Sequence, residues 1–101
     1  MNERQILALL KTGQVAFRYP LKLHYQAGTG QFGVSVPKRH FKRAVKRNLL
    51  KRRMRAAFLA QKERFDPTKW DIFIYYIGKE EEDYGRIEKS LAAVLDDLVA
   101  G

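Results

Sequence analysis

The chain has 101 residues, 46% of them hydrophobic and 12% aromatic, which is enough apolar content for one small folded domain over residues 1–101. It contains 20 Lys and Arg residues against 11 acidic residues, and its formal net charge is +9. The lack of cysteine excludes disulfides and thiolate metal sites, and the N-terminal stretch is too polar for a signal peptide or a membrane span. We therefore expect a cytoplasmic protein that binds a polyanion and does not associate with a membrane.

The first expected elements are a helix and two strands. Asn2 is a suitable cap for a helix that runs to Lys11 and stops at Gly13. Residues 15–26 alternate between apolar and polar side chains, as in a strand, and Pro20 interrupts them. A turn over residues 27–31 leads into a second strand over residues 32–36. We expect these two strands to pair as a hairpin.

Two more helices and an interior strand complete the expected fold. A long helix is predicted from Phe41 to Arg64, a strand that is apolar on both faces from Trp70 to Ile77, and a last helix from Tyr84 to Val99. The order α, β, β, α, β, α predicts an α/β (α+β) two-layer sandwich, with a small mixed sheet and the helices on one face. The buried stripe of the long helix is expected to comprise Leu50, Met54, Ala57, Phe58 and Phe65.

A basic run from Lys38 to Arg55 is the strongest functional signal. Ten of its eighteen residues are Lys or Arg and none is acidic, while ten of the 11 acids lie between Glu63 and Asp97. A solvated helix face normally carries acidic partners one turn away, so this alternative is disfavoured, as are a nuclear-localisation peptide and a membrane-surface helix. Arg pairs with phosphate oxygens and Lys adds positive charge, which favours RNA. The predicted RNA-binding residues are Lys38, Arg39, Lys42, Arg43, Lys46, Arg47, Asn48, Lys51, Arg52 and Arg55.

No catalytic constellation is evident in the sequence. His24 and His40 are its only histidines and lie on different elements without an evident partner. The acidic run Glu80–Asp83 is interpreted as a solvated turn, because consecutive carboxylates in a turn do not all converge on one ion. We therefore expect neither catalytic residues nor metal ligands in this chain.

The basic run resembles the signature of the protein subunit of bacterial ribonuclease P. The strand Phe32–Val36 leads into a Lys-Arg pair, and residues 44–58 then follow the family pattern A-V-x-R-N-R-x-K-R-x-x-R-x-x-F. Leu49 departs from this pattern, where a second Arg is usual, and Arg53 or Lys46 could replace the lost contact. The segment Pro37–Arg43 is one residue longer than the commonest family pattern. The matching residues are Arg47, Asn48, Lys51, Arg52, Arg55 and Phe58.

This resemblance implies a ribonucleoprotein endonuclease, a hydrolase that removes the 5′ leader of precursor tRNA during tRNA processing. Ribonuclease P RNA would carry out the chemistry with Mg²⁺ held mainly by the RNA, and the protein would bind that RNA and the leader without an obligate protein partner. A ribosomal or other structural RNA-binding protein is the alternative.

The resemblance also implies where the leader lies and how the fold is connected. A cleft between the first helix and the sheet would hold the single-stranded leader. The basic helix would lie in a left-handed β–α–β crossover, whereas the sequence pattern alone predicts the right-handed form. The candidate leader-binding residues are Phe17, His24, Tyr25 and Phe32, although strand alternation assigns about half of such aromatic residues to the core.

Overall fold

A mixed sheet lies at the centre of the computed structural model, which describes residues 1–61, 63 and 65–100. Its strands follow the order β1-β2-β4-β3. In chain order the elements are α1 (Glu3–Thr12), β1 (Gln14–Arg18), β2 (Leu21–Ala27), β3 (Phe32–Ser35), α2 (Ala44–Leu59), a 3₁₀ turn (Pro67–Lys69), β4 (Trp70–Tyr76) and α3 (Tyr84–Ala100).

The expected hairpin between residues 15–26 and 32–36 is wrong. Residues 15–26 are two strands rather than one, because the chain reverses at Tyr19-Pro20 and β1 pairs with β2 in antiparallel register. The other side of β2 pairs with β4, which is also antiparallel. Within the described part of the chain, β3 therefore pairs only with β4, and this pair is parallel. The interior strand is β4, as predicted, because it is apolar on both faces and has a partner strand on each side.

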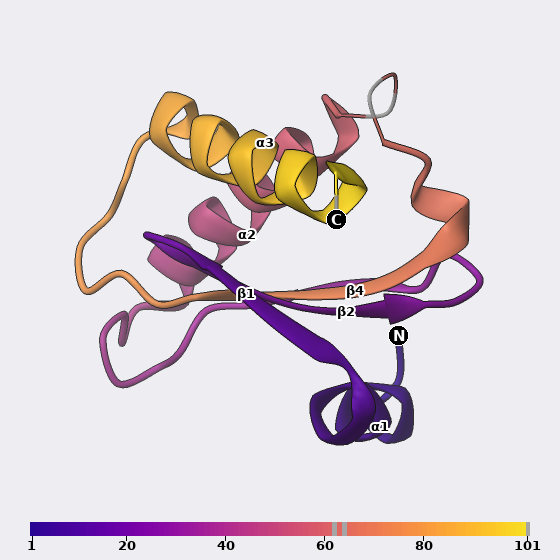
Figure 1. Ribbon diagram of the computed structural model, residues 1–101. Helices are drawn as coiled ribbons and strands as arrows, with labels where there is room; N and C mark the ends of the chain where they lie inside the picture. Colours follow the sequence, from indigo (N-terminus) through magenta and orange to yellow (C-terminus); the bar gives the residue numbers. More distant parts are fainter. Residues whose placement is uncertain (62, 64, 101) are drawn as a thin grey trace.

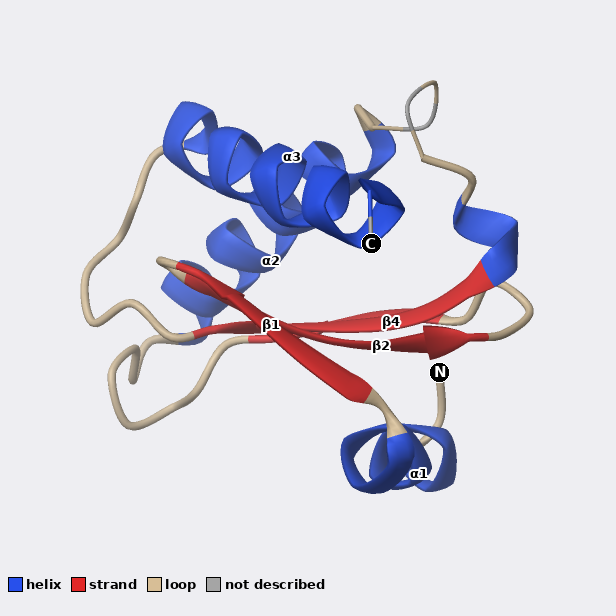
Figure 2. Cartoon of the chain, viewed as in Figure 1, coloured by secondary structure: helices blue, strands red, loops and turns tan. Residues whose placement is uncertain are grey.

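The helices cover both faces of the sheet. Helices α2 and α3 lie side by side over one face, whereas α1 packs alone against the opposite face (Figures 1 and 2). The expectation that all helices share one face is therefore wrong for α1. The second face carries Phe73, which is 5% exposed, and the buried Leu9 of α1 covers this side of the sheet. Among the described residues, no helix is both long and apolar enough to cross a bilayer.

The strands β3 and β4 and the helix α2 form the expected β–α–β unit. In Figure 1 the chain runs along β3, rises into α2, returns above the sheet and descends into β4, which lies between β3 and β2. This path turns in the left-handed sense, as the resemblance implies and against the usual preference for right-handed crossovers. Because α2 follows β3 directly, the basic N-terminal part of α2 lies near the edge of the sheet where β3 ends.

The helix termini agree closely with the sequence, except in α2. Asn2 and Gln5 form a reciprocal capping box at the start of α1, each backbone N–H donating to the other side chain at 2.9 Å. Asp83 caps α3 through the backbone N–H of Arg86 at 2.8 Å. Helix α2 spans only Ala44–Leu59, shorter than predicted at both ends. Residues 62 and 64 of the predicted helix lie outside the described residues.

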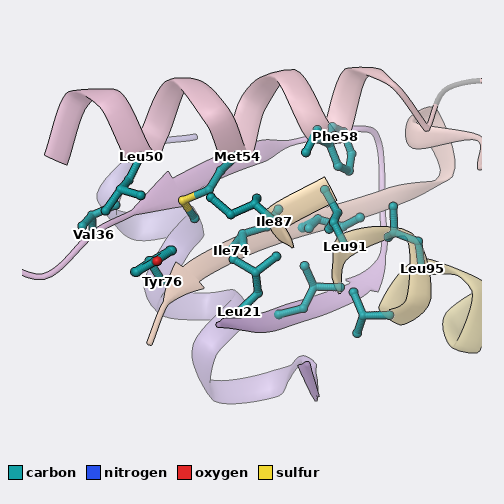
Figure 3. Close-up of a cluster of buried hydrophobic side chains, with 14 of the residues drawn as sticks. Leu21, Val36, Leu50, Met54, Phe58, Ile74, Tyr76, Ile87, Leu91 and Leu95 are labelled. Carbon is teal, nitrogen blue, oxygen red and sulfur yellow. The ribbon is translucent and has the colours of Figure 1, made fainter. Parts of the chain in front are cut away.

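The hydrophobic core lies between the sheet and the pair α2 and α3 (Figure 3). All five predicted stripe residues of α2 and its following turn are buried, and Leu50, Met54 and Ala57 are fully so. The core also contains the inward side chains of β2, β4 and α3. These are Leu21, Leu23, Ile72, Ile74, Tyr76, Ile87, Leu91, Val94, Leu95 and Leu98.

Candidate nucleic-acid interface

The predicted RNA-binding residues divide between the loop that connects β3 to α2 and the outer side of α2. Exposed cations of the loop precede the helix, because α2 begins at Ala44 rather than at Phe41. Phe41 itself is 6% exposed and packs against Tyr76 with ring centroids 5.6 Å apart. The loop residues are Lys38, Arg39, Lys42 and Arg43, and the helix residues are Lys46, Arg47, Asn48, Lys51, Arg52 and Arg55.

Arg47 connects the loop that precedes α2 to the first turn of this helix through two hydrogen bonds. Its Nη1 donates to the carbonyl oxygens of Phe41 at 2.8 Å and Lys42 at 2.9 Å. The N-cap residue Arg43 makes no side-chain capping hydrogen bond, and the first turn contains no acidic residue. Free backbone N–H groups and cations thus lie together at the positive end of the helix dipole, which favours an anion there.

An acidic turn reaches across to the basic helix. Glu81 pairs with Lys46 Nζ at 3.1 Å and with Arg53 Nη1 at 3.2 Å. The hydrogen bond and the charge of Lys46 hold the pKa of the Glu81 carboxyl below its usual value. Arg53 Nη1 also donates to the carbonyl of Glu82 at 2.7 Å. Glu81 is exposed, as expected for a solvated turn, but it also pairs with cations that are far away in sequence.

Tyr76 fixes the position of this turn. Its hydroxyl donates to the carbonyl of Glu80 at 2.6 Å and accepts from the backbone N–H of Glu82 at 2.9 Å. Burial raises the pKa of the Tyr76 hydroxyl to about 12. The β4–α3 connection and the loop before α2 emerge at the same end of the sheet (Figure 2), so the turn can reach the helix. Lys46 and Arg53, the two suggested substitutes for an Arg at position 49, are consequently both engaged with Glu81.

We expect Glu81→Gln to strengthen RNA binding by roughly 2- to 5-fold, because Lys46 and Arg53 would no longer be neutralised by this acid. Glu80→Gln is the matched control, since the Glu80 side chain makes no ion pair among the described residues. Titration of RNA with both variants at fixed salt measures the effect. An equal gain for Glu80→Gln would show that net charge alone is responsible.

An open cleft of about 410 Å³ lies on the α1 side of the sheet. Its wall combines two cations, two histidines, two tyrosines and three apolar residues. Within it, Lys22 and His24 come from β2, Tyr75 comes from β4, and Arg39 comes from the loop before α2. The lining residues are Leu10, Lys22, His24, Pro37, Arg39, His40, Tyr75, Tyr76 and Ile77.

His24 is a buried polar group within this cleft. It is 6% exposed, and its Nδ1 has no hydrogen-bond partner among the described residues. Burial, followed by the nearby charge of Lys22, lowers the pKa of the imidazole. The lowered pKa favours the neutral imidazole. Its Nδ1 is a buried polar atom without a partner among the described residues, which is unfavourable, and this atom is not exposed to the cleft.

The four predicted leader-binding residues separate onto the two faces of the sheet. Phe17 is opposite Lys22 in the β1–β2 register, so it shares the cleft face with His24, and it is 63% exposed. Tyr25 and Phe32 point to the α2 and α3 face. Tyr25 contacts Trp70 with centroids 5.9 Å apart, and Phe32 stacks on Phe58 at 4.1 Å. The structure thus places Phe17 and His24 on the same face of the sheet and the other two in the packing under α2 and α3.

Sequence reasoning missed several residues of the cleft. Lys22 alternates with the buried Leu21 and Leu23, and this pattern places it on the face of His24. The face on which Tyr75 lies could not be predicted, because the β4 sequence is apolar on both faces of the sheet. Ile77 lies in the cleft because β4 ends beside the loop that precedes α2, a long-range arrangement without a local signal. The same arrangement brings Arg39 into the cleft, a residue that was predicted to bind RNA but not assigned to the leader.

Comparisons with known proteins agree with this fold. A family model described as Ribonuclease P matches residues 1–99, whereas a search of curated proteins finds no match. The RNase P protein of Thermotoga maritima is similar in structure with a TM-score of 0.82 at 23% identity, over 96% of this chain and 94% of that chain. The RNase P protein of Staphylococcus aureus has a TM-score of 0.81 at 22% identity, over 97% and 92%. Because the family model covers nearly the whole sequence, the chain belongs to the ribonuclease P protein family.

Proposed function

We propose that this ribonuclease P protein holds the 5′ leader of precursor tRNA in the cleft beside α1, while the cations of α2 and its preceding loop bind ribonuclease P RNA. The main support is that one loop borders both surfaces. Arg39 and His40 line the cleft, and Lys42 and Arg43 of the same loop lie at the start of α2. A protein bound to the catalytic RNA through α2 would therefore present the cleft beside it.

The cleft and the sheet face beside it suit an unpaired RNA strand. Phe17 does not line the cleft, but it lies on the same face next to Lys22 of the lining, whose Nζ is 5.4 Å from the centre of its ring. This exposed ring can stack a base. Lys22 and Arg39 supply positive charge for phosphates. These contacts hold a single strand without strong sequence selection, as a leader of variable sequence requires.

The protein has a supporting role in the chemistry. Among the described residues, no group of three or more His, Asp or Glu side chains could hold a metal ion. We assign the Mg²⁺ of the holoenzyme to the RNA subunit. The protein subunit acts with that RNA and has no indicated catalytic site of its own. Its cations neutralise phosphates of two RNA partners, and this lowers the repulsion between the catalytic RNA and its substrate.

Precursor-tRNA cleavage by a bacterial ribonuclease P RNA at low Mg²⁺ tests the proposal. Addition of the protein is expected to accelerate cleavage, and the gain should be greater for a substrate with a leader than for one with a minimal leader. Phe17→Leu should weaken binding of the leader-bearing substrate by about 1 to 3 kcal/mol, the loss expected for one base stack.

Tyr84→Leu is the control for this experiment. Tyr84 is another exposed aromatic residue, but it lies at the start of α3, which covers the opposite face of the sheet from Phe17 and the cleft. It should leave leader binding unchanged. An equal loss for both variants, or no dependence on the leader, would remove the cleft from the proposal. Tight RNA binding without any acceleration would favour a purely structural RNA-binding role.

A further inference from the structure

A second cationic groove lies between the tip of the β1–β2 hairpin and α3. It has a volume of about 330 Å³ and is lined by Arg18, Tyr19, Arg86, Lys89, Ser90 and Ala93. Ser90 Oγ donates to the carbonyl of Tyr19 at 2.7 Å, which fixes the hairpin tip against the helix. The groove is separate from the cleft, because the two share no lining residue.

The positive charge of this groove is only partly balanced. Arg18 pairs with Asp97 at 3.3 Å, but both side chains are more than half exposed, so the pair is weak. Arg86 and Lys89 make no ion pair with any described acid. Asp83 lies one turn away, where it accepts the backbone N–H of Arg86. The groove therefore contains two cations without an acidic partner among the described residues, Arg86 and Lys89, beside the small side chains of Ser90 and Ala93.

An aromatic ring accompanies these cations. The Arg86 guanidinium lies 5.5 Å from the ring centre of Tyr19, which is 51% exposed. This arrangement parallels Lys22 over Phe17 on the other side of the same hairpin tip. Exposed rings flanked by cations are the combination that binds single-stranded nucleic acid, through stacking and phosphate contacts.

The hairpin tip connects the groove with the cleft. The backbone N–H of Ile77 donates to the carbonyl of Pro20 at 2.8 Å, and Ile77 also lines the cleft. An RNA strand that leaves the cleft beside Lys22 and Ile77 would thus reach the hairpin tip. Tyr19 and the groove lie next along this path. We propose that this groove binds the phosphates of single-stranded RNA that continues out of the cleft, so that long leaders contact the protein at two places. This inference rests on the proposed leader site and extends it.

Leader length separates the two sites experimentally. The double variant Arg86→Gln/Lys89→Gln should bind a precursor with a leader of about 16 nucleotides roughly 5- to 10-fold more weakly, and a leader of about 4 nucleotides with unchanged affinity. The log–log salt slope for the long leader should become shallower by about 1.4, as expected for two lost contacts to a single strand. Thermal unfolding of each variant confirms that it is folded.

The matched control removes two exposed cations elsewhere. Arg4→Gln/Lys69→Gln lowers the net charge equally, at α1 and at the 3₁₀ turn, outside both lining sets. It should not distinguish long from short leaders. Equal losses of affinity for the two double variants, or no loss of affinity of Arg86→Gln/Lys89→Gln for the long leader, would overturn the proposal that this groove binds RNA.

Phe17→Leu keeps the two proposals distinguishable. It should weaken both leaders, because its ring belongs to the cleft side of the hairpin. If Phe17→Leu weakens both leaders while the groove variant changes neither, the cleft stands and the groove fails. If Phe17→Leu has no effect on either leader, the leader site itself fails.

Discussion

Replacement of Arg52 and Arg55 by glutamine is expected to weaken the binding of ribonuclease P RNA by about 2 to 4 kcal/mol, since each loses a charge-assisted contact to phosphate. Both side chains are exposed on α2 and make no ion pair with a described acid. Their full charge is therefore available to the RNA. Binding measured over a series of salt concentrations should show a log–log slope that is shallower by about 1.8, as expected for two phosphate contacts on duplex-like RNA.

Lys46→Gln is an informative comparison for this result. Lys46 lies on the same helix, but Glu81 already neutralises it at 3.1 Å. Its replacement should change both affinity and salt slope less than replacement of either free arginine. Lys69→Gln, in the 3₁₀ turn, controls for net charge. Equal slopes for Arg52→Gln/Arg55→Gln and the unmodified protein would show that the RNA does not contact this side of α2.

Local sequence signals predicted the helices well because the physics of these signals is local. The capping pair Asn2 and Gln5 and the cap Asp83 act within a few residues of the helix ends. The buried stripe of α2 follows from helical periodicity alone. The exception is α2, which is shorter than predicted at both ends. At its start, Phe41 continues the apolar periodicity but packs from the preceding loop.

Strand pairing was harder to predict because neighbours along the chain need not be neighbours in the sheet. Nothing in residues 28–31 indicates that β3 passes β2 and pairs with β4. Asp71 of β4 stabilises the loop in this position, since its Oδ1 accepts hydrogen bonds from the backbone N–H groups of Thr29 at 3.1 Å and Gln31 at 3.0 Å. A carboxylate on β4 thus holds the loop before β3, a contact that spans some forty residues.

The candidate site was predicted in part for the same reason. The cations of α2 are contiguous in sequence and were identified directly. The cleft combines α1, β2, β4 and a loop, so only His24 and Phe17 of the named leader residues lie on its face. The ion pairs of Glu81 could not be predicted, because its partners Lys46 and Arg53 become its neighbours only when β4 brings the acidic turn back to α2.

The basic helix depends on its buried side for a fixed position, and this leads to the second prediction. Leu50→Ala should lower the free energy of unfolding by about 2 to 5 kcal/mol, because Leu50 is 0% exposed and its truncation leaves a cavity between α2 and the sheet. The melting temperature should fall by roughly 10 to 30 °C in a domain of this size. Denaturant or thermal unfolding in the absence of RNA measures both quantities.

Val45→Ala is the matched control on the same helix. Val45 is 78% exposed, so its truncation should change stability by less than about 0.5 kcal/mol. RNA that binds the folded protein should raise the melting temperature of Leu50→Ala through mass action, because its cations are intact. In contrast, Arg52→Gln/Arg55→Gln should unfold like the unmodified protein yet gain less stability from RNA. If Leu50→Ala and Val45→Ala were equally stable, α2 would not be anchored through its apolar stripe, and the cations of this helix would lack the rigid support that their placement requires.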